Sequence, residues 1–290
     1  MGTIILKKNL TTKIILMTIS FYTMSEAQAM LKALNTAASG MAAQETNVGT
    51  ISNNIANVNT TGFKRGRTEI EDLTYETIQE AGSRSSASTN YNVGTQIGTG
   101  ARVSSVRKEF TNGAPQITNN PFDLMINGDG FFGVIMPNGE LKFTRDGSFN
   151  VDAQGVMVTK QGYKIYPGFN FPPNTSTVAI SDDGKMQAFT KGGATPSEVG
   201  QLPVFTFVNP VGLKSVGMNL YQISLSSGQP VQGIPGADNI GSIMQGSLEA
   251  SNVSPMIEMT DLIRAQRAYE MNSKVMGVAD QMLQTINNIR

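Results

Sequence analysis

The sequence contains no histidine, no cysteine and no tryptophan among its 290 residues. Without cysteine, disulfide bonds and thiolate nucleophiles are excluded. Without histidine, the most common general base and the most common metal ligand are missing, so Ser-His-Asp catalysis and Cys/His zinc sites are excluded as well. Carboxylate pairs and a Ser-Lys dyad stay possible, but no spacing favours either of them. We therefore expect no catalytic residues, no cofactor and no metal.

Charge is scarce and balanced. Lys and Arg together number 22, as do Asp and Glu, and charged residues make up 15% of the chain, against about 25% in a typical soluble domain. A net charge of zero removes the usual argument for nucleic acid or an anionic membrane as partner. Low charge together with many Gly, Asn, Ser and Thr residues favours a surface that contacts other protein; a neutral extracellular domain is the alternative.

Residues 1–29 differ in character from the rest of the chain. Three lysines precede an apolar run at 14–22, and Ala27-Gln28-Ala29 has the form of a signal-peptide cleavage site. The run is too short to cross a bilayer as a helix. Two interpretations stay open: a secretory presequence, or an upstream-start artefact with the true start at Met30.

Apolar residues at heptad spacing predict a helix after Met30. The two rows are Leu34, Met41, Val48 and Ile55, and Ala37, Gln44, Ile51 and Val58. They form a coiled-coil-like seam, although Gly40, Gly49 and Gln44 weaken it. The helix would be about 40 Å long.

The last segment predicts a second helix. Ser254 suits the N-cap and Pro255 the first helical position. The apolar rows beyond them are Leu262, Tyr269, Met276 and Leu283, and Ala268, Val275, Met282 and Ile289, with Ala265, Ala279 and Ile286 beside them. This stripe is wide, so we expect it to be covered from more than one side. Either the two helices pack against the sheet as ordinary core, or copies from neighbouring subunits cover them.

Turn signals every 8 to 12 residues in the middle of the chain predict an antiparallel β domain. Asn138-Gly139 is a strong hairpin signal. Strands are expected at 148–151, 156–159 and 163–166, and five apolar residues are expected in the core: Phe131, Phe132, Val134, Phe143 and Phe149.

These segments predict an α+β fold. Long N- and C-terminal α-helices pack as a coiled-coil-like pair, with an extended linker and a central antiparallel β domain. The expected boundaries are 1–29 for the presequence or upstream-start artefact, 30–62 for the N-terminal helix, 63–100 for the linker, 101–245 for the β domain and 246–290 for the C-terminal helix.

Three separated segments resemble the bacterial flagellar axial proteins, the rod and hook subunits. They are LNTAASGMAAQETNVGTISNNIANVNTTGFKR (34–65), NGDGFFGVIMPNGELKFTRDGSFNVDAQGVMVTKQGYKIYP (127–167), and the C-terminal segment that begins GSLEASNVSPMIEMTDLIRAQRAYE (246–270). The resemblance covers Met30 to Arg290. Within the family, residues 65–103 most resemble distal rod subunits, which carry an F-x-D-L-x-Y-x-T-I segment, a serine-rich stretch and G-x-Q-I-G-T-G. Ile70 replaces the phenylalanine.

The resemblance implies a structural subunit of the flagellar basal body that is exported by the flagellar secretion apparatus. Such subunits assemble as a helical tube around an export channel, with the terminal helices inside and the β domain outside. The implied partners are further copies of the chain, proximal rod subunits, hook subunits, and the peptidoglycan and outer-membrane ring bushings, with no nucleic acid and no direct membrane insertion. A distal rod transmits motor torque to the hook. The alternatives are a hook or proximal rod subunit and, more remotely, a secreted β-rich adhesin.

The candidate site is therefore a subunit interface. We expect it to comprise Leu34, Met41, Val48, Ile51, Ile55, Asn57, Gly62, Phe63, Lys64, Arg65, Leu262, Tyr269, Val275, Met276, Met282, Leu283 and Ile286. The asparagine-rich stretch at 53–59 should end the first helix, because Asn bonds locally to backbone groups and tolerates left-handed conformations. Gly62 should adopt a conformation closed to other residues. Lys64 and Arg65 should meet carboxylates or carbonyls of a neighbour, or else form a solvated pair.

The linker suggests a mechanism for stiffness. Residues 66–98 contain few residues that could bury themselves within the linker. If this segment lies across adjacent subunits, it would lock their relative sliding and keep a rod straight.

Overall fold

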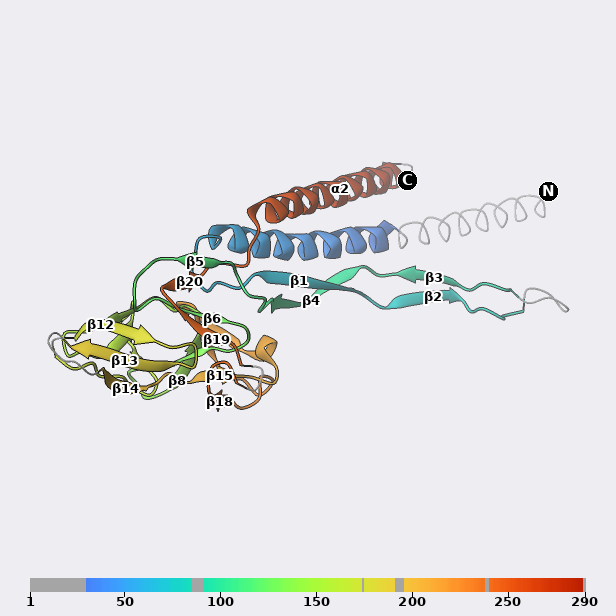
Figure 1. Ribbon diagram of the computed structural model, residues 1–290. Coiled ribbons are helices and arrows are strands. Elements are labelled where there is room, and N and C mark those ends of the chain that lie inside the picture. Colours follow the sequence, from blue (N-terminus) through green and yellow to red (C-terminus); the bar gives the residue numbers. More distant parts are fainter. Residues whose placement is uncertain (1–29, 85–90, 174, 191–195, 238–239, 289–290) are drawn as a thin grey trace, which may run out of the picture. The chain divides into compact units, whose positions relative to one another are not determined.

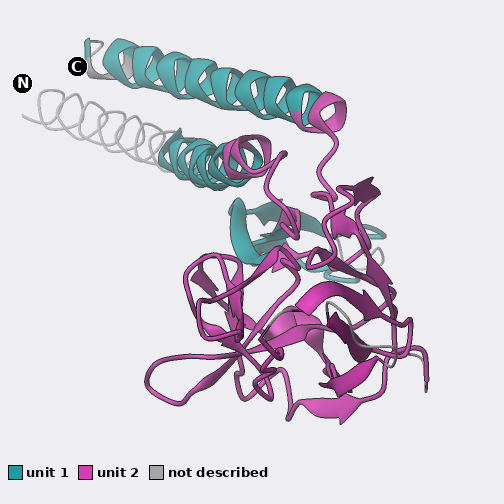
Figure 2. Cartoon of the chain, turned by 60° about the vertical axis from the view of Figure 1, so that its left-hand side comes forward, with its two compact units in different colours: residues 1–51, 68–106, 259–290 teal, residues 52–67, 107–258 magenta. Residues whose placement is uncertain are grey.

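The computed structural model describes residues 30–84, 91–173, 175–190, 196–237 and 240–288 (Figure 1). The predicted presequence at 1–29 lies outside this range. The described chain divides into two compact units (Figure 2). The first contains residues 30–51, 68–106 and 259–288, and the second contains 52–67 and 107–258. The predicted domain boundaries themselves stay a prediction.

Two long helices and a β-ribbon make up the first unit. The N-terminal helix occupies residues 30–56 of the described chain. Helix α2 (Pro255–Asn288) begins where the sequence predicts, with Glu258 N donating to Ser254 O at 3.0 Å. Its 34 residues give a length of about 50 Å. No helix among the described residues has an apolar stretch that could cross a bilayer.

The ribbon occupies most of the stretch that we expected to be an extended linker. It pairs β1 (Gly66–Asp72) with β4 (Ala101–Lys108), and β2 (Tyr75–Gln79) with β3 (Thr95–Gly98). Leu73 N donates to Gly100 O at 2.8 Å between these two pairs. Every residue of β3 and all but the last of β2 are exposed. A two-stranded ribbon without a buried face is marginally stable alone in water.

The second unit is antiparallel β structure, as the turn spacing predicts. Its largest sheet has seven strands in the order β16 (Lys214–Gly217), β17 (Leu220–Gln222), β8 (Leu141–Thr144), β7 (Phe132–Ile135), β11 (Lys164–Ile165), β10 (Met157–Thr159) and β9 (Phe149–Val151). A second sheet contains β12 (Thr175–Ile180), β13 (Lys185–Thr190) and β14 (Ser197–Gln201). The predicted hairpin at Asn138-Gly139 joins β7 to β8, with Gly139 at φ +80°.

Three smaller strand pairs complete this unit. They are β15 (Val204–Thr206) with β18 (Val231–Gly233), β19 (Ser242–Gln245) with β6 (Leu124–Asn127), and β20 (Ser247–Glu249) with β5 (Pro115–Ile117). A short 3-10 helix, η1, spans Pro210–Gly212. The β20–β5 pair is central to the site, because β20 ends six residues before α2 begins.

The core of the second unit confirms the predicted apolar residues. Phe131, Phe132, Val134, Phe143 and Phe149 are all at most 2% exposed. Phe132 and Phe149 meet edge to face at 5.1 Å between ring centroids. Burying each such side chain stabilises the fold by about 1.5–3 kcal/mol.

The α+β class agrees with these elements, but the predicted coiled-coil-like pair is wrong. A coiled coil buries large apolar side chains along one seam. Among the described side chains of the two helices, the buried apolar residues are Ala37, Ala43, Ile51, Ala265 and Ala279. Three predicted seam residues, Tyr269, Val275 and Met282, are exposed.

At Gly40 the two helices meet through a small residue and a polar side chain. A Cβ added to Gly40 would lie 2.8 Å from Nδ2 of Asn272. The heptad count failed because it placed Val275 and Met282 on the same stripe as Leu262 and Leu283, whereas the structure exposes the first pair and half-buries the second.

Candidate functional site

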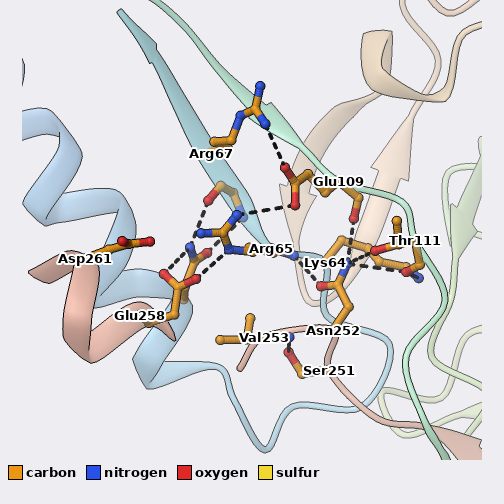
Figure 3. A network of polar contacts seen from close by, with 12 residues as sticks. Lys64, Arg65, Arg67, Glu109, Thr111, Ser251, Asn252, Val253, Glu258 and Asp261 are labelled. Carbon is orange, nitrogen blue, oxygen red and sulfur yellow. Dashed lines mark hydrogen bonds and ion pairs between the residues drawn. The ribbon is translucent and has the colours of Figure 1, made fainter. Parts of the chain in front are cut away.

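A buried polar cluster lies in the second unit, where the end of the N-terminal helix, the start of β1 and the start of α2 come together (Figure 3). We call it the polar junction and define it by its six main residues: Asn54, Lys64, Arg65, Arg145, Glu249 and Glu258. The backbone conformation at Gly62 lets the chain pass close to the backbone of Arg145 in this cluster. Gly62 has φ +67°, and a Cβ there would lie 2.7 Å from the backbone of Arg145. The predicted conformational role of Gly62 is confirmed.

Glu249 is the centre of the junction. Its Oε1 accepts from Lys64 Nζ at 2.6 Å and from Gly113 N at 2.9 Å. Its Oε2 lies 3.6 Å from Arg145 Nη1. All three charged side chains are about 1% exposed. Its backbone carbonyl also accepts from Gly62 N at 2.8 Å, so this residue fixes the chain through both its side chain and its backbone.

Arg145 and Lys64 also donate hydrogen bonds to backbone carbonyls, although Nε of Arg145 is buried without a hydrogen-bond partner. Arg145 Nη2 donates to Gly128 O at 2.9 Å, and its guanidinium lies 5.3 Å from the centre of the Phe131 ring. Lys64 Nζ donates to Thr111 O at 2.8 Å. Carbonyl dipoles partly replace the hydration that both cations lose on burial.

Two buried cations share one carboxylate, and the pKa values reflect this imbalance. Burial, and then the positive charge of Arg145, lower the pKa of Lys64 to about 8, although Glu249 opposes the change. Burial also lowers the pKa of Arg145. Burial raises the pKa of Tyr221, which is near Arg145, to about 12. Burying Lys64 and Arg145 as cations therefore costs free energy, and their interactions with Glu249 offset part of this cost.

The second half of the junction connects the two helices. Glu258, in the first turn of α2, is fully buried. It accepts hydrogen bonds from Arg65 Nε and from Asn54 Nδ2, the latter at 3.0 Å. Burial alone would lower the pKa of Arg65, but the hydrogen bonds and charges of Glu258 and Glu109 outweigh it and raise that pKa.

The side-chain amide of Asn54 hydrogen-bonds to the backbone of Gly66 in the way that a neighbouring strand would. Its Nδ2 donates to Gly66 O and its Oδ1 accepts from Gly66 N, both at 2.8 Å. The helix therefore ends against the first residue of β1. Asn252 does the same on the other side: its Oδ1 accepts from Arg65 N at 2.7 Å and its Nδ2 donates to Glu109 O at 2.8 Å (Figure 3).

The structure brings together only part of the predicted interface set. Gly62, Lys64 and Arg65 lie in the polar junction, and Phe63 beside them lies under Lys108 Nζ, which is 4.4 Å from its ring centre. The other predicted residues of the N-terminal helix are Leu34, Met41, Val48, Ile51, Ile55 and, just beyond its end, Asn57; all are half-buried except Ile51, which is buried. On α2, Leu262, Met276 and Leu283 are half-buried, and the side chain of Ile286 lies outside the described residues.

The ammonium group of Lys64 is bound within its own chain rather than presented to a neighbour. Four junction residues were not predicted: Asn54, Arg145, Glu249 and Glu258. Glu258 had a local signal, since an acidic residue in the first turn favours the helix dipole. Glu249 and Arg145 had none, because their partners are distant in sequence.

Helix α2 carries a second apolar face. Met259, Ile263, Met271, Val275, Val278 and Met282 are each 49–60% exposed. We call these six residues the outer stripe. Their spacing of three, four or eight residues places them on one side of the helix at about 100° per residue, opposite the buried Ala265 and Ala279. The exposed charged residues Arg264, Arg267, Glu270 and Lys274 lie on the same side of the helix and interrupt the stripe.

No group of His, Cys, Asp or Glu among the described residues could hold a metal ion. The polar junction joins the end of the N-terminal helix, the start of β1 and the start of α2 through hydrogen bonds and ion pairs.

The shared carboxylate predicts an order of mutational effects. Glu249→Gln removes the carboxylate that both Lys64 and Arg145 contact and should cost at least about 3 kcal/mol of unfolding free energy. Lys64→Met leaves Arg145 with its partner and should cost about 1 kcal/mol. The control is Glu71→Gln, at an exposed ion pair with Arg102, which should leave the unfolding free energy close to that of the original chain. Urea unfolding measures all three, and equal losses for Glu249→Gln and Lys64→Met would contradict the shared-carboxylate model.

The lowered pKa of Lys64 predicts that stability rises with pH. Between the folded pKa of about 8 and the ordinary 10.5, the unfolded chain binds more protons at this lysine than the folded chain, so the unfolding free energy increases with pH. The slope is at most roughly 1 kcal/mol per pH unit. Tyr221 acts in the opposite direction above its ordinary pKa of 10, so urea unfolding is best followed from pH 8 to pH 10.

Lys64→Met serves as the control for that series. Its slope should be smaller but not zero, because burial also lowers the pKa of Lys108. An unchanged slope in the variant would show that Lys64 titrates normally.

Comparison with known proteins agrees with the resemblance seen in the sequence. Three family models match: Flagella basal body rod protein at residues 34–64, Flagellar hook protein FlgE/F/G D1 domain at 125–188, and Flagellar basal body rod FlgEFG protein C-terminal at 244–289. The polar junction draws residues from all three of these segments: Asn54 and Lys64 from the first, Arg145 from the second, and Glu249 and Glu258 from the third.

The chain is also similar to curated relatives along most of its length. It is 46% identical over 261 residues to the flagellar basal-body rod protein FlgG of Caulobacter vibrioides, covering 90% of this chain and 100% of the relative. It is 44% identical over 263 residues to the protein of the same name from Borreliella burgdorferi, covering 90% and 99%. With identity at this level over nearly the whole length of the relatives, the chain belongs to the flagellar basal-body rod protein family.

Proposed function

We propose that this chain self-assembles into a rigid helical tube in which the outer stripe of α2 is covered by helices of neighbouring copies. Family membership makes the chain a structural subunit of the flagellar distal rod, located in the basal body, and not an enzyme. It assembles with other rod and hook components. In the proposed tube, the terminal helices enclose the export channel and the tube carries motor torque to the hook.

The outer stripe is the observation that carries this proposal. Six large apolar side chains lie exposed on one face of α2, while its opposite face carries the small buried alanines. Contiguous exposed apolar surface of this kind marks a protein contact site. A second copy fits it best, because the large exposed side chains of this face are mainly apolar and the chain as a whole has no net positive charge that would favour nucleic acid, although Arg264, Arg267 and Lys274 lie among them.

The remaining predicted interface residues, on both helices, belong to the same proposal. Half-buried positions such as Leu34, Met41, Leu262 and Met276 keep apolar area that neighbouring copies would cover. Lys64 instead supports assembly from within, by fixing where the two helices leave the β domain. We also propose that the peptidoglycan and outer-membrane ring bushings contact the β domain, and that the chain binds no nucleic acid and does not insert into the membrane directly.

The outer stripe can be tested with one added carboxylate. Val278→Glu places a charge on the stripe and should abolish tube formation by the purified chain, because the charge would be buried unpaired in the interface. Ser273→Glu adds the same charge to the same helix at an exposed polar position outside the stripe and should leave assembly intact. Electron microscopy and light scattering measure both variants. Tubes of normal yield from Val278→Glu would contradict the proposal.

The ribbon of β1–β4 and β2–β3 is the proposed source of stiffness. Tyr75, Ile78 and Ile97 are 44–62% exposed, so the ribbon offers apolar side chains on an element that has little cover of its own. Lying across a neighbouring copy, it would resist the sliding of one subunit past the next.

Shortening the ribbon tests this proposal. Residues 75–98 are replaced by Asn-Gly, a turn that suits a two-residue hairpin, while the Leu73–Gly100 hydrogen bond keeps the base closed. Tubes should still form but with a bending persistence length reduced several-fold, as measured from their curvature in electron micrographs. An unfolding free energy equal to that of the full chain serves as the control. Straight tubes of undiminished rigidity would refute the role of the ribbon.

A further inference from the structure

Half of the outer stripe is methionine. Met259, Met271 and Met282 are 58%, 60% and 49% exposed and lie on the same face as Ile263, Val275 and Val278. Other methionines of this chain have the opposite environment: Met125, Met157 and Met186, in the second unit, are at most 3% exposed. The chain thus contains an accessible set and a protected set of the same side chain.

Exposure decides which thioethers a hydroperoxide can reach. In the reaction, the sulfur attacks the peroxide, the O–O bond breaks, and one oxygen is transferred to form the sulfoxide. The sulfur loses two electrons and the peroxide is reduced to water, or to an alcohol for an organic peroxide. The product is polar and chiral, and it disrupts apolar interfaces that contain methionine.

We propose that Met259, Met271 and Met282 form an oxidation site at which a hydroperoxide switches off self-assembly of the free subunit. This inference rests on the proposed function, since it requires that the outer stripe be covered by neighbouring copies. A sulfoxide oxygen buried in that contact would need a hydrogen-bond donor. The five other stripe residues around any one of these methionines are methionine, isoleucine or valine and have no donor; Arg267 and Lys274, each one turn from Met271, are the charged donors beside that methionine.

Assembly in turn protects the three stripe methionines from oxidation. A methionine that is covered in the tube is protected from peroxide, so oxidation acts on subunits before assembly rather than on a finished tube. Enzymatic reduction of the sulfoxide returns the apolar side chain, so the block is reversible.

The experiment uses the full chain and hydrogen peroxide as the probe. Free subunits are treated, the oxidised residues are identified by peptide mass spectrometry, and tube formation is followed by light scattering and electron microscopy. We expect sulfoxide at the three stripe methionines at least tenfold faster than at Met125, Met157 and Met186. We expect assembly to slow at least tenfold and to recover after treatment with methionine sulfoxide reductases.

A matched pair of variants separates the stripe from other exposed methionines. The triple variant Met259→Leu, Met271→Leu, Met282→Leu keeps the apolar volume but cannot be oxidised, and it should assemble normally after peroxide treatment. Met218→Leu removes a methionine of the second unit that is 66% exposed, and this variant should stay as sensitive as the original chain.

The outcomes distinguish this inference from the proposed function. If untreated subunits form no tubes, the proposed function fails, and the switch fails with it. If untreated subunits form tubes and fully oxidised subunits form them equally well, only the switch is overturned. A triple leucine variant that assembles untreated but stays peroxide-sensitive would overturn it too, by placing the sensitivity elsewhere.

Discussion

The buried carboxylate of Glu249 is the constraint on which the arrangement of the second unit depends. Two cations, Lys64 and Arg145, are held in the same low-dielectric environment by direct ion pairs with this carboxylate, and Asp129 adds a weaker negative charge. Without Glu249, each cation would lose its hydration and its directly paired carboxylate. Because Lys64 follows the N-terminal helix and Glu249 precedes α2, the same ion pair ties the two ends of the chain to the β structure.

Around Glu249, the side-chain amides of two asparagines form hydrogen bonds with backbone groups that would otherwise be unpaired. Asn54 and Asn252 each satisfy backbone N–H and C=O groups at the point where one element gives way to the next. Such groups must be paired when they are buried. Replacing most side chains of the polar junction by apolar ones would therefore leave a buried hydrogen-bonding partner unpaired. This explains why several of the few charged residues of the chain lie here.

The sequence predicts this structure well wherever the signals are local. The hairpin at Asn138-Gly139, the start of α2 at Pro255, the left-handed Gly62 and the buried phenylalanines are all predicted by short patterns. The coiled-coil-like pair does not hold, because heptad spacing identifies apolar residues but not the number of faces that they occupy. Deciding between one wide stripe and two opposite faces requires knowing which residues are covered.

The polar junction could not be predicted from the sequence, for a different reason. Lys64 looks like part of an exposed basic pair, and its environment is decided by Glu249, which is 185 residues away. Nothing near position 64 indicates that partner. The ribbon was missed as strand because the segment 66–98 becomes rich in Ser, Thr, Gly and Asn after Ile78, which resembles an unstructured connection, and only cross-strand pairing reveals the strands.

The ion pairs of the ribbon are exposed to solvent, whereas the ion pair between Lys64 and Glu249 in the polar junction is buried. On the ribbon, Arg102 pairs with Glu71 and Lys32 with Glu76, and all four side chains are 40–67% exposed. Dissolved ions screen such pairs strongly but hardly reach a buried one. Ionic strength therefore acts selectively on this molecule: a concentrated salt solution loosens the hold of the N-terminal helix on the ribbon while the bonds around Glu249 keep their strength.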